Sequence, residues 1–481
     1  MDVISYSVSE EAIPLDPTNM SGGYGTLDYT KLEEPGDSRR LYTNGSISDP
    51  IKGEYSGEIQ RIEITDGTTS FTVNSGLAQF NRWVRAEPYE GELGDYFLYL
   101  ADVCGVTSQI YFGANVPNPD VLIPGFNGNA WDYLRKIASL YSVKVSQIKS
   151  AIVFNSFTES TAWNNWETTR NVSLSTESTA ERVVVNWYDS DWKDNSEIII
   201  PEFDDAISVD AGERLEQEFE VNGSIDLVQS EPRVFDYVGP NEDWTNTTGG
   251  YCVSGNDGKP ITAEQWKAQG GSVKVQIGDN PSTIKVIVTG ATGTDYAPYR
   301  IAATSGTSDY YNSLHIVGSG IFWEKNQFSM HTGAPQATDS DDSVQEIDDP
   351  AINTLPLAVQ TAQRVSSQMC GGMQTVSAES QYLNRPNQWD NSDGSLDMYD
   401  QSFGNVVGSR MTGSEVNYRI TSTTTTAENI SYDMEVFTTV EDWNNFAEHV
   451  ASISTIADFN TWYNGYRFVD FNNDCLNGRS E

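Results

Sequence analysis

The sequence predicts a mainly β protein built from antiparallel strands, with a small α/β segment inserted near the N-terminal third. Apolar and polar residues alternate with period two in stretches such as 58–64 and 272–277, which is typical of half-buried antiparallel strands. Turn residues, as at 66–67 (DG), 222–223 (NG) and 278–281 (GDNP), separate such runs. Helical spacing of apolar residues is confined to three short stretches.

Each element follows from its local pattern. Strands are expected at 58–64, 70–73, 272–277, 416–422 and 432–437. A helix is expected within 91–105, and Gly105 fits its C-terminal cap. A second helix is expected at 131–141, and the Pro-rich piece 116–124 between the two is expected to be extended. The sequence therefore predicts a small α/β insertion at roughly residues 85–160.

A third helix is expected at 355–370, after an acidic run at 339–349. Acidic residues ahead of a helix interact favourably with the positive end of its dipole. The same run also fits a solvated linker. The end of the chain, 456–481, is aromatic-rich and irregular.

Composition excludes several classes of protein. The chain has 481 residues and a net charge of −41, from 28 basic and 69 acidic residues. This charge opposes tight binding of nucleic-acid phosphates, which depends on Lys and Arg clusters. No run approaches the roughly 18 apolar residues of a membrane span, while 12 Trp, 24 Tyr and 18 Phe argue against disorder. The N-terminus has no secretory signal pattern, so synthesis in a cytoplasm is expected.

The residues that usually perform catalysis are sparse. The three histidines, His315, His331 and His449, have no metal-ligand spacing, and HExxH, GxSxG and Walker motifs are absent from the sequence. The four cysteines, at 104, 252, 370 and 475, are too far apart for a CxxC pair. A glycosidase needs only two carboxylates, but no pair stands out. We therefore expect no enzymatic activity and no cofactor.

One weak metal pattern lies at the end of the chain. Asp470, Asn472, Asp474 and Glu481 match positions 1, 3, 5 and 12 of a calcium loop. Position 6, where the sharp turn favours Gly, is Cys475. Aromatic clusters at 163–166 and 462–466 could stack on sugars, although such residues more often anchor cores and interfaces.

Five segments in a fixed order carry a family resemblance. They are 57–105, 128–138, 270–302, 347–352 and 442–462. Together they span most of the chain and resemble the baseplate hub, or minor tail protein, of long non-contractile-tailed bacteriophages, a family related to tail-tube proteins. The chain departs from the family's pattern at Ala351, where an aromatic residue usually follows Asp-Pro.

The resemblance implies two tail-tube-type antiparallel β-barrel domains, a small α/β insertion and a mixed C-terminal region. The first barrel would comprise residues 1–85 and 165–235, with the insertion at 86–164. The second barrel would begin at 236–345. Residues 346–481 would add a helix and strands that complete it, and then a C-terminal tail.

The resemblance also implies a structural role in the virion, at the tail tip, after synthesis in the bacterial host cytoplasm. The chain would form a homotrimeric hub that closes the tail tube and lines part of the DNA ejection channel. Its partners would be the distal tail or tail-tube ring, the tape-measure protein and tail fibre or tip proteins. DNA would pass without specific binding, so we expect neutral or acidic side chains on the channel wall.

Two alternatives are a receptor- or carbohydrate-binding tail protein and a cell-wall hydrolase carried in a tail. Trimeric fibre-type binders usually contain shaft repeats, and the sequence contains none. A hydrolase would usually offer His and Asp residues around a metal or nucleophile, and the scattered histidines do not.

Overall fold

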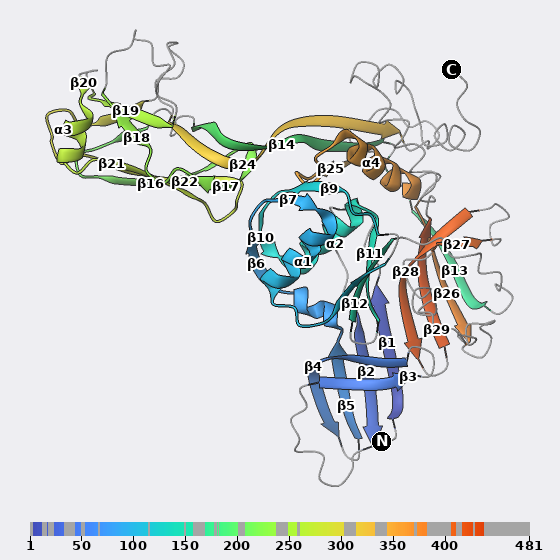
Figure 1. Cartoon of the computed structure of the whole chain (residues 1–481). Coiled ribbons are helices and arrows are strands. Elements are labelled where there is room, and N and C mark those ends of the chain that lie inside the picture. The colour runs from blue at the N-terminus through green and yellow to red at the C-terminus, as the bar shows by residue number, and fades with distance from the viewer. Residues whose placement is uncertain are drawn as a thin grey trace, which may run out of the picture.

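The computed structural model describes residues 3–11, 17, 24–32, 44–49, 53–65, 68–113, 116–148, 151–156, 169–177, 180, 182–200, 207–236, 249–256, 260–302, 314–331, 344–369, 373–381, 406–409, 416–426 and 429–436. These form a sheet region, a central α/β unit and a long arm (Figure 1). The fold is mainly β, as the sequence predicts. Among the described residues, no helix has the length and apolar character needed to cross a membrane.

A ten-stranded sheet brings the two ends of the described chain together. Its path runs β13-β26-β29-β28-β1-β2-β5-β4-β3, with β27 beside β28. The strands are β1 (Val3–Glu11), β2 (Thr26–Leu32), β3 (Asn44–Asp49), β4 (Gly53–Thr65), β5 (Thr68–Asn74), β13 (Thr169–Glu177), β26 (Met373–Gln381), β27 (Val406–Ser409), β28 (Val416–Thr426) and β29 (Asn429–Val436). The antiparallel pair β1–β28 joins N-terminal to C-terminal strands.

The central unit holds two of the three predicted helices, α1 (Leu93–Cys104) and α2 (Ala130–Leu140). Its other elements are η2 (Gly76–Phe80), β6 (Trp83–Ala86), β7 (Tyr89–Glu92), β8 (Ile110–Phe112), β9 (Asp120–Ile123), β10 (Phe126–Asn129), β11 (Val143–Ile148) and β12 (Ala151–Ser156). As predicted, Gly105 ends α1 in the left-handed region, at φ 63°. Asn129 caps α2, and its side chain accepts hydrogen bonds from the N–H groups of Trp131 and Asp132.

The arm grows from two long antiparallel strands, β14 (Arg182–Ile200) and β24 (Leu314–His331), and projects from the central unit in Figure 1. Its other strands are β15 (Ser208–Val209), β16 (Arg214–Glu220), β17 (Gly223–Val228), β18 (Arg233–Phe235), β19 (Gly250–Ser254), β20 (Pro260–Ile261), β21 (Ser272–Ile277), β22 (Thr283–Thr289), β23 (Tyr299–Ala302) and β25 (Val344–Asp348), with helix α3 (Ala263–Ala268). A separate apolar core around Trp266 fills the arm.

The third predicted helix is α4 (Leu355–Met369), and it joins the parts of the molecule. It contacts β14 and β24 at the arm root, and β26 and β29 of the ten-stranded sheet. Its buried Leu357, Ala358 and Val365 belong to the same core as α1 and α2. The guanidinium of its buried Arg364 donates hydrogen bonds to the carbonyl groups of Ser139 and Leu140, at the end of α2.

The predicted turn at 222–223 lies where β16 ends and β17 begins, and these two strands belong to different sheets. In the C-terminal part, β28 pairs with β1 and β26 pairs with β13 in the ten-stranded sheet. Period-two alternation predicts that a segment is a strand but not which strand it pairs with. The two-barrel division at the predicted boundaries stays a prediction.

Candidate functional site: the polar face of the ten-stranded sheet

Most of the described side chains on one face of the ten-stranded sheet carry hydroxyl or carboxyl groups. Because successive residues of a strand point to opposite faces, the register brings these residues to one side across seven strands. We call them the polar face: Ser7, Ser9, Asp28, Thr30, Glu58, Arg61, Glu63, Ser70, Thr72, Ser377, Glu379, Ser422, Thr424, Ser431 and Asp433. All of them are exposed or half-buried.

The opposite face explains this orientation. Val8, Leu27, Phe71 and Val73 occupy the alternate positions and form a buried cluster. The rings of Tyr29 and Phe71 stack with centroids 4.8 Å apart. Burial of this apolar face fixes the register, since a slip by one residue would expose it. The polar face must therefore point away from that core.

Cross-strand hydrogen bonds order the polar face. The Thr72 hydroxyl donates to Asp28 Oδ1 at 2.6 Å, and Thr30 and Ser70 share a hydrogen bond of 2.9 Å. At the other end of the sheet, Asp433 accepts hydrogen bonds from Ser377 at 2.6 Å and Ser422 at 2.8 Å. These hydrogen bonds between neighbouring strands hold the Asp28 and Asp433 carboxylates in place on the polar face.

The described polar face is electronegative. Its described side chains include the carboxylates of Asp28, Glu58, Glu63, Glu379 and Asp433 and the guanidinium of Arg61. The strand register also places Arg170, opposite Glu379, and Arg419, opposite Glu435, on this side of the sheet. Arg61 donates to Glu63 Oε2 at 3.1 Å, so a neighbouring acid offsets its charge. A hollow of about 420 Å³ lies over Asp28, Arg61 and Thr72. Its described side chains can repel a polyanion, and they include no cluster of cations that would bind one.

Polar contacts connect the base of the arm to the central unit. Lys136 of α2 forms an ion pair of 2.5 Å with the buried side chain of Asp349. Lys325 Nζ lies 2.7 Å from Asp348 Oδ2, and the Tyr188 hydroxyl donates to Asp348 Oδ1. Burial opposes ionisation of Asp348, but the hydrogen bonds from Lys325 and Tyr188 outweigh it and lower its pKa.

The described end of the acidic run at 339–349 forms ion pairs with two different parts of the fold. Asp348 and Asp349 pair with lysines of the arm and of α2 rather than standing free ahead of α4. Residues 339–343 of the same run lie outside the described residues.

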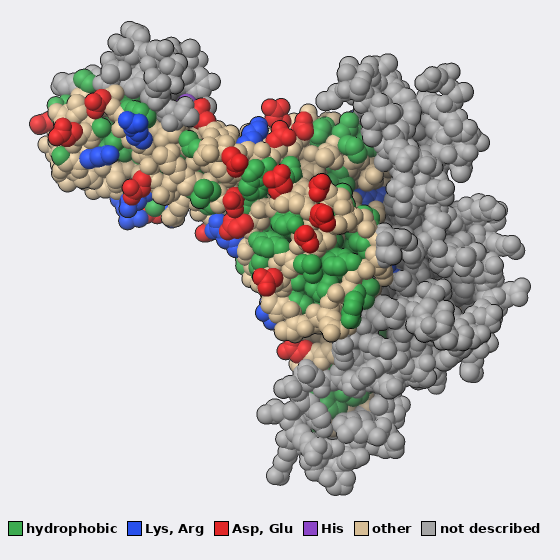
Figure 2. Space-filling view, viewed as in Figure 1, with side chains coloured by type: hydrophobic (Ala, Val, Ile, Leu, Met, Phe, Trp, Pro, Cys, Tyr) green, Lys and Arg blue, Asp and Glu red, His purple; other side chains and the backbone are tan. Residues whose placement is uncertain are grey.

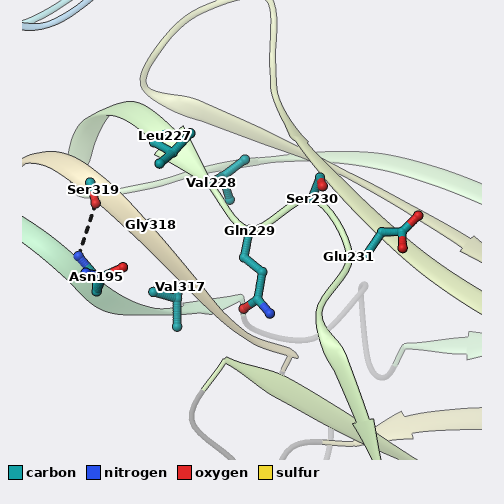
Figure 3. A pocket seen from close by; sticks show the side chains of 9 residues that line it. All are labelled: Asn195, Leu227, Val228, Gln229, Ser230, Glu231, Val317, Gly318 and Ser319. Atoms are coloured by element: carbon teal, nitrogen blue, oxygen red, sulfur yellow. Dashed lines mark hydrogen bonds between the residues drawn. The ribbon is translucent and has the colours of Figure 1, made fainter.

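A groove on the arm is the other hollow of note. It measures about 520 Å³ and is lined by Asn195, Leu227, Val228, Gln229, Ser230, Glu231, Val317, Gly318 and Ser319 (Figure 3). The Asn195 N–H donates to the Ser319 hydroxyl at 3.1 Å. Glu231 is the one ionisable side chain in this lining, so the groove lacks the paired groups that acid–base or nucleophilic catalysis needs.

The predicted chemical residues fall into two groups. His315 lies on β24, buried, with Nδ1 2.6 Å from Glu197 Oε1, which fits the predicted packed or rim position. Cys104 and Cys252 are buried free thiols, and burial raises their pKa to about 11 and about 12, respectively. Thiols with such pKa values are poor nucleophiles at neutral pH.

The remaining candidates lie outside the described residues. These are the calcium-loop residues Asp470, Asn472, Asp474 and Glu481, the aromatic clusters at 163–166 and 462–466, Cys370, Cys475 and His449. His331 lies on β24. Within the described residues, no three His, Cys, Asp or Glu side chains come together to hold a metal ion.

The sequence contains a signal for part of the polar face. Hydroxyl and acidic residues recur at every second position in 26–30 and 70–72, and this spacing predicts a polar strand face. Residues 421–426 are an unbroken run of Ser and Thr, which does not predict which positions face the core. The pairing of β1 with β28, which joins these strands into one sheet, connects residues that are more than 300 positions apart in the chain.

Comparison with known proteins adds structural likenesses at low identity. No protein-family profile matches the chain, and no curated protein matches it. A prophage tail protein, gp18, from Listeria monocytogenes has 7% identity and a TM-score of 0.40, covering 89% of this chain and 87% of its own. The 43 kDa tail protein of prophage MuSo2 from Shewanella oneidensis has 10% identity and a TM-score of 0.42, covering 91% and 94%.

A third likeness is to the E. coli c3393 protein, a type VI secretion component described as similar to the T4 tail proteins gp27 and gp5. It has 7% identity and a TM-score of 0.36, covering 91% of this chain and 74% of its own. With TM-scores under 0.5, these likenesses do not establish a shared fold or function.

Proposed function

We propose that the chain is a structural protein of a phage tail, and that three copies form a hub ring at the tail tip. The polar face would line the axial channel through which DNA leaves. The observation that carries the proposal is the composition of the polar face: its described side chains are mostly hydroxyls and carboxylates, and Arg61 among them is paired to Glu63. The order of the five hub-like segments in the sequence supports the same role.

The chemistry of DNA passage favours such a wall. Duplex DNA carries one negative charge per about 1.7 Å of its axis, and Lys or Arg clusters bind it by releasing counterions. Hydroxyl and carboxylate groups do not displace counterions from DNA, so they gain no binding energy in this way. The repulsion from the carboxylates acts within about 8 Å at physiological salt, so it prevents adhesion at the wall without blocking the channel.

The open sheet gives a physical reason for assembly. Within the described strands, the sheet begins at β13 and ends at β3, and the outer edge of each has backbone groups available for pairing. Contacts between copies could cover these edges. Three copies with two similar barrels each would present six near-equivalent positions to a six-fold tail tube. The partners would be the distal tail or tail-tube ring, the tape-measure protein and fibre or tip proteins.

Reversing the wall charge tests this proposal. A phage carrying Asp28→Lys, Glu63→Lys and Asp433→Lys should assemble tails but eject DNA more slowly, because the new cations hold phosphates. The delay should shrink as salt is raised. Ejection from purified virions can be followed with a DNA-binding dye after triggering.

A matched control places the same charges on the arm. Asp191→Lys, Glu220→Lys and Glu231→Lys change three exposed acids there, and ejection should keep the parent rate. Equal delays in both triple variants would contradict a channel role for the polar face, as would a parent rate in the face variant. A neutral series with Asn and Gln on the face should also eject at the parent rate.

A further inference from the structure

Strand β8 forms one edge of a small sheet in the central unit. Among the described strands it pairs only with β12, in parallel, at the end of the β11-β12-β8 sheet, and its outer edge has no partner there. Ile152 N–H donates to Gln109 O, and Gly113 N–H donates to Phe154 O, each at 2.8 Å. The backbone groups of odd-numbered residues therefore face β12, and those of Ile110 and Phe112 face outward. A further strand could pair with them.

Aromatic side chains are exposed on both faces of this edge. Phe112 is 38% exposed on the core side, where its ring stacks on Phe154 at 5.1 Å. Tyr111 is 53% exposed on the other side. A strand added to β8 would cover both rings. Edges that must stay unpaired usually carry Lys, Pro or a bulge, and residues 108–113 (SQIYFG) contain no Lys or Pro.

The start of helix α1, which carries an exposed acid, lies beside this edge. Helix α1 begins against it, because a Cβ added at Gly94 would lie 3.9 Å from Phe112 Cε1. Asp95, Leu98 and Asp102 form the exposed stripe of α1, and Leu98 is 44% exposed. Figure 2 shows apolar side chains gathered over the central unit, with acidic ones around them. Such acidic groups repel an equally acidic second copy and attract Lys and Arg.

We propose that the outer edge of β8 docks an extended segment of a different protein, which adds to the β11-β12-β8 sheet as a fourth strand. The segment would place apolar residues on one face, where they cover Tyr111, and Lys or Arg residues on the other face, where Phe112 and the start of α1 with Asp95 lie. Backbone hydrogen bonds to Ile110 and Phe112 would supply the pairing. This proposal does not depend on the proposed channel.

A short peptide tests the proposal on the full purified chain. The probe is a fluorescent eight-residue peptide of alternating valine and lysine, and binding is measured by anisotropy. Tyr111→Lys should weaken binding by about tenfold, because it removes an aromatic contact and adds a like charge. Leu227→Lys is the matched control: it adds the same charge at a residue that is 64% exposed on the arm, and it should change binding less than twofold.

A second probe separates strand addition from simple charge attraction. The same peptide with alternate amides N-methylated keeps its charge but loses the donors that pair with β8, and it should bind at least about tenfold more weakly. Equal binding of the two peptides, no binding of either, or equal loss in both Lys variants would overturn the proposal. Dimers of the parent chain that Tyr111→Lys dissociates would also overturn it, since they would show that a second copy occupies the edge.

Discussion

Replacing Arg364 by methionine should loosen the junction between α2 and α4. The Arg364 side chain is fully buried, and its guanidinium donates to the carbonyls of Ser139 and Leu140, the latter at 2.9 Å. These carbonyls end α2, where the helix leaves its last acceptors without internal donors and its dipole is negative. Methionine keeps most of the buried volume but offers no donor.

The size of the effect follows mainly from one buried acceptor. The Ser139 carbonyl keeps a hydrogen bond of 3.2 Å from the Ser142 N–H, whereas the Leu140 carbonyl loses the donor that Arg364 supplies. A buried acceptor left unsatisfied costs about 1–3 kcal/mol, so the variant should lose about 2 kcal/mol in the free energy of local opening. Since about 1.4 kcal/mol is a factor of ten, amide hydrogen exchange in the last turn of α2 should become about 30-fold faster.

Hydrogen exchange followed by mass spectrometry measures this opening peptide by peptide, so it does not require the whole chain to unfold in one step. Arg61→Met is the control, because the Arg61 side chain is 70% exposed in its pair with Glu63 and such pairs contribute about 0–1 kcal/mol. Exchange in α2 that changes less than about fivefold in the Arg364 variant would refute the capping argument.

Three further predictions concern single sites. Lys325→Met should lower the free energy of unfolding by no more than about 1 kcal/mol at pH 7, because both charged groups are largely exposed. Because the pKa of Asp348 is lowered in the folded chain, this loss should fade as the pH falls below about 4. Thermal melts that show equal losses at pH 7 and pH 3 would disprove the pairing. Gly105→Ala should destabilise the central unit by about 1 kcal/mol in urea titrations because φ is positive there, whereas Gly128→Ala, without that constraint, should cost less; the reverse order would contradict the cap assignment. Calcium should shift Tm by less than about 2 °C, since the C-terminal loop pattern lacks its turn glycine; a larger rise that Asp470→Ala abolishes would show that the loop binds calcium.

Local patterns in the sequence predicted much of the secondary structure. The helices at 93–104, 130–140 and 355–369 follow from apolar spacing and, for the first, from Gly105 as a cap. The strand predicted at 58–64 lies inside β4, although a register shift between Ile59 and Arg61 interrupts its alternation. These elements depend on interactions within a few residues.

The sheet order could not be predicted in the same way. Pairing of β1 with β28 joins residues more than 400 positions apart, such as Ser9 and Thr424. Many strands here have hydroxyl residues on one face and apolar residues on the other, so their patterns fit several partners equally well. The polar face, which depends on this order, was therefore visible in the sequence only as separate short alternations.

The most direct test of the proposed function is a cryo-EM map of the tail tip of the virion that contains this chain. The proposal predicts three copies around the axis, an open channel, and Asp28, Ser70, Thr72 and Asp433 facing the lumen. One copy, six copies, or copies found only in peripheral fibres would contradict the hub assignment. A channel wall lined with Lys and Arg, with the polar face turned away from it, would contradict the role proposed for this surface.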